Sequence, residues 1–109
     1  MASRDRLHGT LDLLILKTLS WGPRHGYAIA RWLEEGGAER LKVEDGSLYP
    51  ALYRMEKEGW IRSEWRTSEL GRDAKFYLIT PAGRKHLRAQ TADWIAFAST
   101  VTRILEAQA

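Results

Sequence analysis

Two segments rich in aromatic and β-branched residues, joined by a short turn-like stretch, limit the folds open to this chain. The segments are Trp60–Thr67 ("WIRSEWRT") and Lys75–Ile79, and Gly71 lies in the "SELGRDA" stretch that connects them. Such residues on both sides of a glycine-containing connection predict a β-hairpin. Apolar residues at helical spacing occur on both sides of this hairpin, so we expect a mainly α fold with a small β-hairpin.

Two helices are predicted near the start of the chain. Leucine and isoleucine recur at helical spacing over about Thr10–Ser20, and the "WGPRHG" stretch ends that helix with glycine and proline. A second helix is predicted over about His25–Glu35 and ends at "EGG". The following Arg40–Asp45 segment is a candidate for a short extended piece.

A third helix is predicted in "DGSLYPALYRMEKEGWI". With Ser47 as the N-cap, Pro50 falls in the first turn, where backbone amides have no partner within the helix. Gly59 ends the helix. Its buried stripe consists of apolar residues at i, i+4 and i+7, which are Leu48, Leu52 and Met55.

The last predicted helix begins in "TPAG", with Thr80 as the N-cap and Pro81 at the first helical position, and it runs to about Gln108. Three helices, a hairpin and a helix are the order of a winged helix-turn-helix with a C-terminal extension. We therefore expect a winged helix-turn-helix DNA-binding domain over residues 1–80 and a long C-terminal dimerisation helix over residues 81–109.

Charge and composition exclude several classes of protein. The chain has 109 residues, no cysteine and a net charge of +3, and Arg62–Arg88 holds seven basic residues against three acidic ones. A basic segment in a folded domain suggests a polyanionic partner, although a solvated surface has the same composition. No apolar run is long enough for a membrane helix, and the N-terminus lacks the apolar core of a signal peptide. We expect a cytoplasmic protein.

The chain resembles the PadR family of bacterial transcription regulators. The similarity covers about residues 7–88 and is carried by three segments between residues 11 and 87, "LDLLILKTLSWGPRHGYAIA", "GSLYPALYRMEKEGWI" and "KFYLITPAGRKHL". The resemblance implies a dimeric DNA-binding repressor of the short branch of the family, which has one C-terminal helix.

The winged-helix arrangement predicts the residues that contact DNA. Side chains opposite the buried stripe of the third helix would enter the major groove, and its start would hold a phosphate. Basic residues of the hairpin would reach the minor groove or the backbone, and a tyrosine of the second helix would contact a phosphate. The predicted residues are Ser47, Tyr49, Pro50, Tyr53, Arg54, Lys57, Arg66, Arg72, Lys75 and Tyr27. Alternatively, the tyrosines are half-buried core residues and the hairpin turn is a solvated loop.

The last helix predicts an assembly. Apolar residues recur along it at heptad-like spacing, and they are Leu87, Trp94, Ala98, Val101 and Leu105. One domain does not need so long a stripe, so we expect a homodimer with twofold symmetry, in which the stripe meets the same helix or the first helix of a second copy. Alternatively, the stripe folds back on its own domain. Two copies of Trp94 could also flank a small planar aromatic effector, or Trp94 could simply fill the dimer core.

These features predict a sequence-specific regulator, acting as a repressor, that binds an inverted-repeat operator on double-stranded DNA. Two alternatives are a winged helix that binds another protein and a non-specific nucleic-acid binder. No catalytic motif is present, and no pair among His8, His25 and His86 has metal-ligand spacing. The sequence therefore predicts no enzyme, no cofactor and no metal site.

Overall fold

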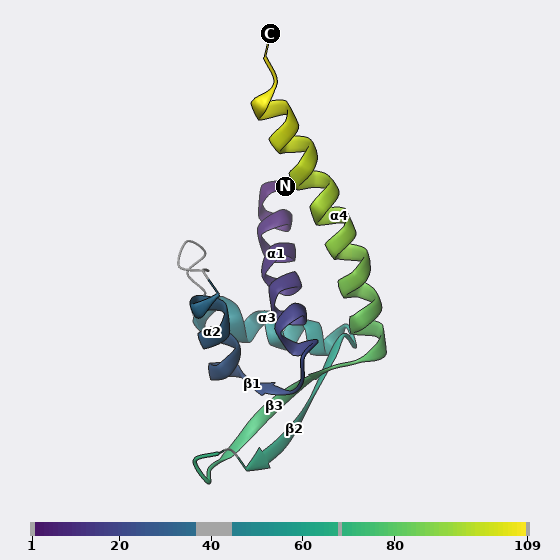
Figure 1. Ribbon diagram of the computed structural model, residues 1–109. Coiled ribbons are helices and arrows are strands. Elements are labelled where there is room, and N and C mark those ends of the chain that lie inside the picture. The colour runs from purple at the N-terminus through teal and green to yellow at the C-terminus, as the bar shows by residue number, and fades with distance from the viewer. Residues whose placement is uncertain (1, 37–44, 68, 109) are drawn as a thin grey trace.

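The computed structural model describes the backbone of residues 2–36, 45–67 and 69–108, and the side chains of these residues except 2–8 and 45–47. Its elements run α1 (Ala2–Leu19), β1 (Arg24–His25), α2 (Gly26–Glu35), α3 (Asp45–Lys57), β2 (Ile61–Thr67), β3 (Asp73–Ile79) and α4 (Pro81–Glu106). Three helices and a small sheet form the body, and α4 rises beside α1 and projects beyond it (Figure 1). The fold is a winged helix-turn-helix with a long C-terminal helix, as the sequence predicted.

The core lies where α1, α2 and α3 meet the base of the hairpin. Its fully buried side chains come from all three helices and from β2, and they include Ile15, Leu16, Ile29, Leu52 and Ile61. The stripe predicted for the third helix is confirmed, because Leu48, Leu52 and Met55 are each at most 1% exposed. Burial of these aliphatic side chains is the main force that holds the three helices together.

The hairpin is confirmed, but it belongs to a three-stranded antiparallel sheet in the order β1–β3–β2. The short strand β1 pairs Arg24 with Tyr77 and His25 with Phe76, and the sequence analysis missed it. His25 also caps α2, since its Nδ1 accepts the amide of Ala28 at 3.1 Å. One residue therefore fixes both the start of α2 and the root of the hairpin.

Two predicted helix starts were wrong. The first helix begins at Ala2 rather than near Thr10. The third begins at Asp45, so Ser47 lies within α3 and Pro50 lies inside the helix instead of in its first turn. A proline there removes one backbone hydrogen bond of the helix. The extended piece expected at Arg40–Asp45 falls outside the described residues, apart from Asp45, which begins α3.

The start of α4 is confirmed. The Thr80 hydroxyl accepts the amide of Gly83 at 3.0 Å, and Pro81 occupies the first turn. Gly83 is buried against the backbone carbonyl of Trp60, where a Cβ atom would lie only 2.0 Å from that oxygen. Leu87 then packs on the core of its own domain. The first turns of α4 therefore cover the core, and the assignment of Leu87 to a dimer stripe stays a prediction.

Candidate nucleic-acid interface

The outward side of α3 presents Tyr49, Pro50, Tyr53 and Lys57 to solvent. The Lys57 ammonium lies 4.7 Å from the centre of the Tyr53 ring, so the two side chains form one exposed unit. Tyr49 has a mixed role. Its ring packs so closely on Gly26 that a Cβ there would lie 2.8 Å from it, yet nearly half of the side chain is exposed.

Arg54 does not project freely from α3. Its guanidinium forms an ion pair with Asp12, whose side chain is largely buried in α1. The pair joins two helices across 42 positions of sequence and holds one end of the guanidinium against the domain. Arg54 remains partly exposed, so it lies at the surface beside the outward side of α3. The side chain of Ser47 lies outside the described residues.

The basic residues of the hairpin are held by nearby carboxylates. Arg62 and Arg66 both pair with Glu64, and hydrogen bonds first from Arg66 and then from Arg62 lower the pKa of Glu64. The Lys75 ammonium lies 3.6 Å from a carboxylate oxygen of Glu56 on α3. This contact links the hairpin to the helix beside it.

The tip of the hairpin turns at Gly71, whose positive φ of 75° favours glycine. Arg72 follows at an exposed position of the same turn. The tip therefore carries a guanidinium at the end of the hairpin farthest from α4 (Figure 1).

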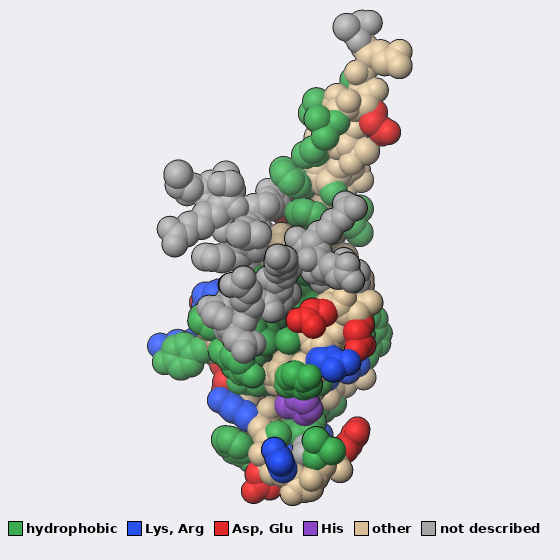
Figure 2. Space-filling model, turned by 90° about the vertical axis from the view of Figure 1, so that its left-hand side faces the viewer, with side chains coloured by type: hydrophobic (Ala, Val, Ile, Leu, Met, Phe, Trp, Pro, Cys, Tyr) green, Lys and Arg blue, Asp and Glu red, His purple; other side chains and the backbone are tan. Residues whose placement is uncertain are grey.

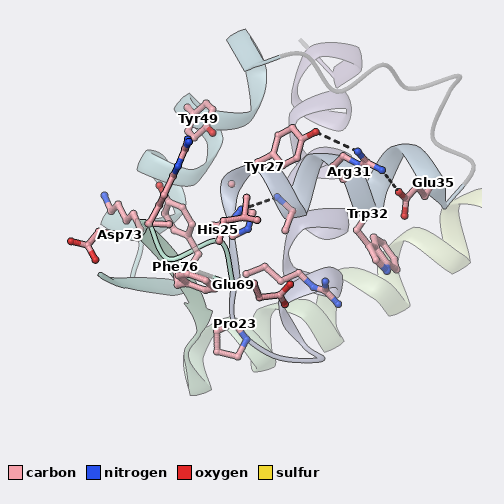
Figure 3. Close-up of a pocket in the computed structure, with 18 residues that line it drawn as sticks. Pro23, His25, Tyr27, Arg31, Trp32, Glu35, Tyr49, Glu69, Asp73 and Phe76 are labelled. Atoms are coloured by element: carbon pink, nitrogen blue, oxygen red, sulfur yellow. Dashed lines mark hydrogen bonds and ion pairs between the residues drawn. The ribbon is translucent and has the colours of Figure 1, made fainter. Parts of the chain in front are cut away.

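A groove of about 930 Å³ lies between the start of α2, β1 and the hairpin. The rings of Tyr27, His25, Phe76 and Tyr49 lie around it (Figure 3). Within this group His25 is roughly parallel to Tyr27, at an interplanar angle of 16°, and meets Phe76 edge-on with ring centres 5.4 Å apart. Arg72 and Lys75 also line the groove, together with Glu69 and Asp73, so aromatic surface meets charged side chains of both signs.

Along the exposed side of α2, Tyr27, Arg31 and Glu35 are spaced four residues apart. Arg31 donates to the Tyr27 hydroxyl at 3.3 Å and to the Glu35 carboxylate at 2.9 Å (Figure 3). The Tyr27 hydroxyl, followed by Glu35, raises the pKa of the Arg31 guanidinium. The sequence analysis selected Tyr27 and missed Arg31, although the i, i+4 spacing was a signal for this pairing.

The projecting part of α4 exposes an apolar stretch, visible as hydrophobic side chains along the extension of the molecule (Figure 2). Trp94 and Val101 are 36% and 38% exposed, Leu105 is 79% exposed, and Ala98 is partly buried. Phe97, which the predicted stripe did not include, lies with its ring centre 6.0 Å from that of Trp94. The side chain of Phe97 therefore widens the exposed aromatic surface at this level.

Comparisons with known proteins identify relatives across almost the whole chain. The PadR-like transcriptional regulator family matches residues 15–89. A transcriptional regulator of Mycobacterium tuberculosis is 35% identical over 84 residues, which cover 77% of this chain and 75% of that protein.

Solved structures give the same result. A PadR-like transcriptional regulator from Bacillus cereus has a TM-score of 0.84 and 32% identity, and the match covers 95% of this chain and 99% of that one. A transcriptional regulator from Clostridium thermocellum has a TM-score of 0.82 and 27% identity, with 94% and 99% covered.

The fold and the comparisons define a transcriptional regulator built on a winged helix. More particularly, the chain belongs to the PadR-like family. The family and these structural neighbours are regulators rather than enzymes. Among the helices of the described residues, none has both the length and the apolar character needed to cross a membrane.

Proposed function

We propose that the chain is a repressor that binds an inverted repeat in double-stranded DNA as a homodimer. The observation that carries this proposal is the exposed side of α3, with Pro50, Tyr53 and Lys57, beside a hairpin that carries Arg72 and Lys75. A helix fits the major groove, where base edges distinguish all four base pairs. An arginine at the hairpin tip suits the narrow minor groove, where the potential is most negative.

The homodimer is supported by the apolar stretch of α4 that projects from the domain. Trp94, Val101 and Leu105 are exposed in a single chain, and a second copy of the same helix offers them a matching surface. A twofold dimer would place two copies of α3 about one turn of DNA apart, ~34 Å. Residues 81–109 then act as the dimerisation helix of a DNA-binding domain formed by residues 1–80.

A selected-duplex titration tests DNA binding. The parent chain should prefer one palindromic duplex over random DNA by at least ~10³-fold. A dimer with about 6–10 phosphate contacts should lose ~10³–10⁵ in affinity between 50 and 200 mM salt. Lys57→Ala should weaken operator binding, whereas Arg103→Ala removes the same charge far from the hairpin and should not.

The alternatives have distinct outcomes in the same titration. Equal affinity for all duplexes would identify a non-specific nucleic-acid binder and contradict sequence-specific regulation. Absence of binding at low salt would contradict a DNA-binding role and favour a winged helix that binds another protein.

An effector site between two copies of Trp94 is a second part of the proposal. Trp94 and Phe97 form an exposed aromatic pair on the stretch that would meet its symmetry mate. Indole faces favour both stacking and cation–π contact, so a planar aromatic cation would fit between them. Fluorescence titration should show quenching that Trp94→Ala abolishes, together with altered operator affinity. Equal quenching in both proteins would make Trp94 a packing residue.

A further inference from the structure

We propose that Arg31 is a positioning residue, anchored by Glu35, that directs the Tyr27 hydroxyl toward a phosphate of bound DNA. This inference rests on the proposed function and adds to it a recognition element on α2. In this role Glu35, an acidic residue that lines the groove, favours the binding of DNA.

The hydrogen bond between Arg31 and Tyr27 can run in one direction only. A guanidinium has only donors, so the Tyr27 oxygen must be the acceptor in its contact with Arg31 at 3.3 Å. The hydroxyl hydrogen is then left to point elsewhere. Within the part of the chain that the structure describes, no group accepts that hydrogen, and the side chain of Tyr27 is 64% exposed. The Tyr27 hydroxyl can therefore donate a hydrogen bond to an acceptor on a bound molecule.

The Tyr27 hydroxyl lies in a groove beside the hairpin. Tyr27 lines the groove between α2 and the hairpin. The same lining holds four cations against three carboxylates, namely Arg24, Arg31, Arg72 and Lys75 against Glu35, Glu69 and Asp73. A DNA phosphate has only acceptor oxygens at neutral pH, and most protein contacts to DNA are made to phosphate and sugar. A positive charge next to the phenol oxygen polarises the O–H bond and makes it a better donor. Phosphate thus matches the donor, in a groove whose lining carries one more cation than carboxylate.

Glu35 restrains the side chain of Arg31. Its carboxylate accepts from the second terminal nitrogen of the guanidinium at 2.9 Å, while the guanidinium carbon lies 5.9 Å from the centre of the Tyr27 ring. A free arginine side chain has many rotamers, and holding it costs conformational entropy. With its two ends held along the helix, Arg31 is oriented before DNA arrives, which reduces the entropy lost on binding.

Substitution of Glu35 should change operator affinity in the direction opposite to that expected from net charge. Removing a negative charge from a surface that binds a polyanion should strengthen binding if only net charge matters. Glu35→Gln should instead weaken operator binding about two- to threefold, because Arg31 loses its anchor. Glu34→Gln is the matched control, since it removes the same charge from the adjacent exposed position of α2. That control should leave affinity unchanged or slightly higher.

A double-mutant cycle separates positioning from direct contact. Tyr27→Phe should weaken operator binding about ten- to a hundredfold, as expected for one hydrogen bond to a charged acceptor. Arg31→Met should weaken it by a similar or smaller factor, and should have little further effect in the Tyr27→Phe background. Neither substitution should change the dependence of affinity on salt.

Three results would overturn the proposal. Arg31→Met could weaken binding equally in both backgrounds, or could reduce the salt slope by about one, and either result would mean that Arg31 itself contacts a phosphate. Glu35→Gln could tighten binding as Glu34→Gln does, and net charge alone would then explain the surface.

A measurement without DNA distinguishes failure of this inference from failure of the proposed function. NMR of the Arg31 guanidinium in the free protein should show restricted rotation that Glu35→Gln and Tyr27→Phe both release. Free rotation in the parent chain would contradict the positioning role. Restricted rotation in a chain that binds no duplex would overturn both the proposed function and the role toward phosphate.

Discussion

Leu87 in the first half of α4 lies seven residues before Trp94, in line with the apolar positions of the second half, but the two halves have different surroundings. In the first half Gly83 is buried against the carbonyl of Trp60 and Leu87 packs on the core, whereas Val101 and Leu105 of the second half are exposed. Periodicity along a helix therefore shows that a face is apolar without showing what covers it. The first half belongs to the stability of the domain, and we propose that the second half belongs to assembly.

The largest expected effect tests the second half. Val101→Asp would place two like charges at the proposed twofold interface, and we expect it to weaken the dimer by about 4 kcal/mol, on the order of a thousandfold. Sedimentation equilibrium should show a folded monomer, and operator affinity should fall with it. Ala96→Asp is the control, because helical periodicity puts position 96 on the opposite side of the helix. A dimer that tolerates Val101→Asp would contradict the assignment of this half.

Gly83 tests the first half. Gly83→Ala would bring a methyl group to 2.0 Å from the carbonyl oxygen of Trp60, so α4 and the start of β2 must separate. We expect a loss of about 3 kcal/mol in the free energy of unfolding, measured by urea denaturation. Gly9→Ala is a suitable control, since a Cβ there meets nothing within 4 Å. Unchanged stability would mean that the start of α4 is not closely packed.

Leu87 sharpens the comparison because it was predicted to lie in the dimer interface. Leu87→Ala should lower the free energy of unfolding by about 2 kcal/mol, since Leu87 is only partly buried. The dissociation constant of the proposed dimer should change little in the Leu87→Ala variant. A large change in the dimer dissociation constant, with no change in the free energy of unfolding, would show that Leu87 acts in the dimer interface.

A smaller effect is expected from pH. Burial, with added contributions from Glu56 and Tyr49, raises the pKa of Tyr77 above its ordinary value of 10.0. Because the folded pKa is the higher one, this contribution is complete below about pH 10 and is lost as the pH rises through the folded pKa. Urea denaturation between pH 8 and 11 should show a shallower decline for Tyr77→Phe than for the parent chain. Parallel declines would exclude Tyr77 as the cause.

Local patterns were sufficient to predict most of the fold. The stripe of α3 and the Thr80–Pro81 start of α4 depend on neighbours within one or two turns, and both were predicted correctly. Strand β1 was missed because two residues, Arg24 and His25, are too few to show a periodicity. Its existence depends on backbone pairing with β3, far along the chain.

The candidate site was less accessible from sequence for the same reason. The ion pair of Arg54 with Asp12 joins α3 to α1, and nothing near either residue in the sequence signals it. The placement of Leu87 likewise depends on where the core lies. In contrast, the contact of Arg31 with Tyr27 lies within one helix and follows a spacing that could have been recognised.

The small sheet at the root of the hairpin has a consequence for how such regulators diversify. Backbone pairing of β1 with β3, and the cap that His25 gives α2, hold the hairpin without help from the side chains at its tip. Codons for the tip and for the exposed Tyr53 and Lys57 of α3 can therefore accumulate changes while the folded domain is inherited intact. Under the proposed DNA-binding role, a lineage could acquire new target sequences through a few surface substitutions, with selection acting on which genes are controlled rather than on whether the chain folds.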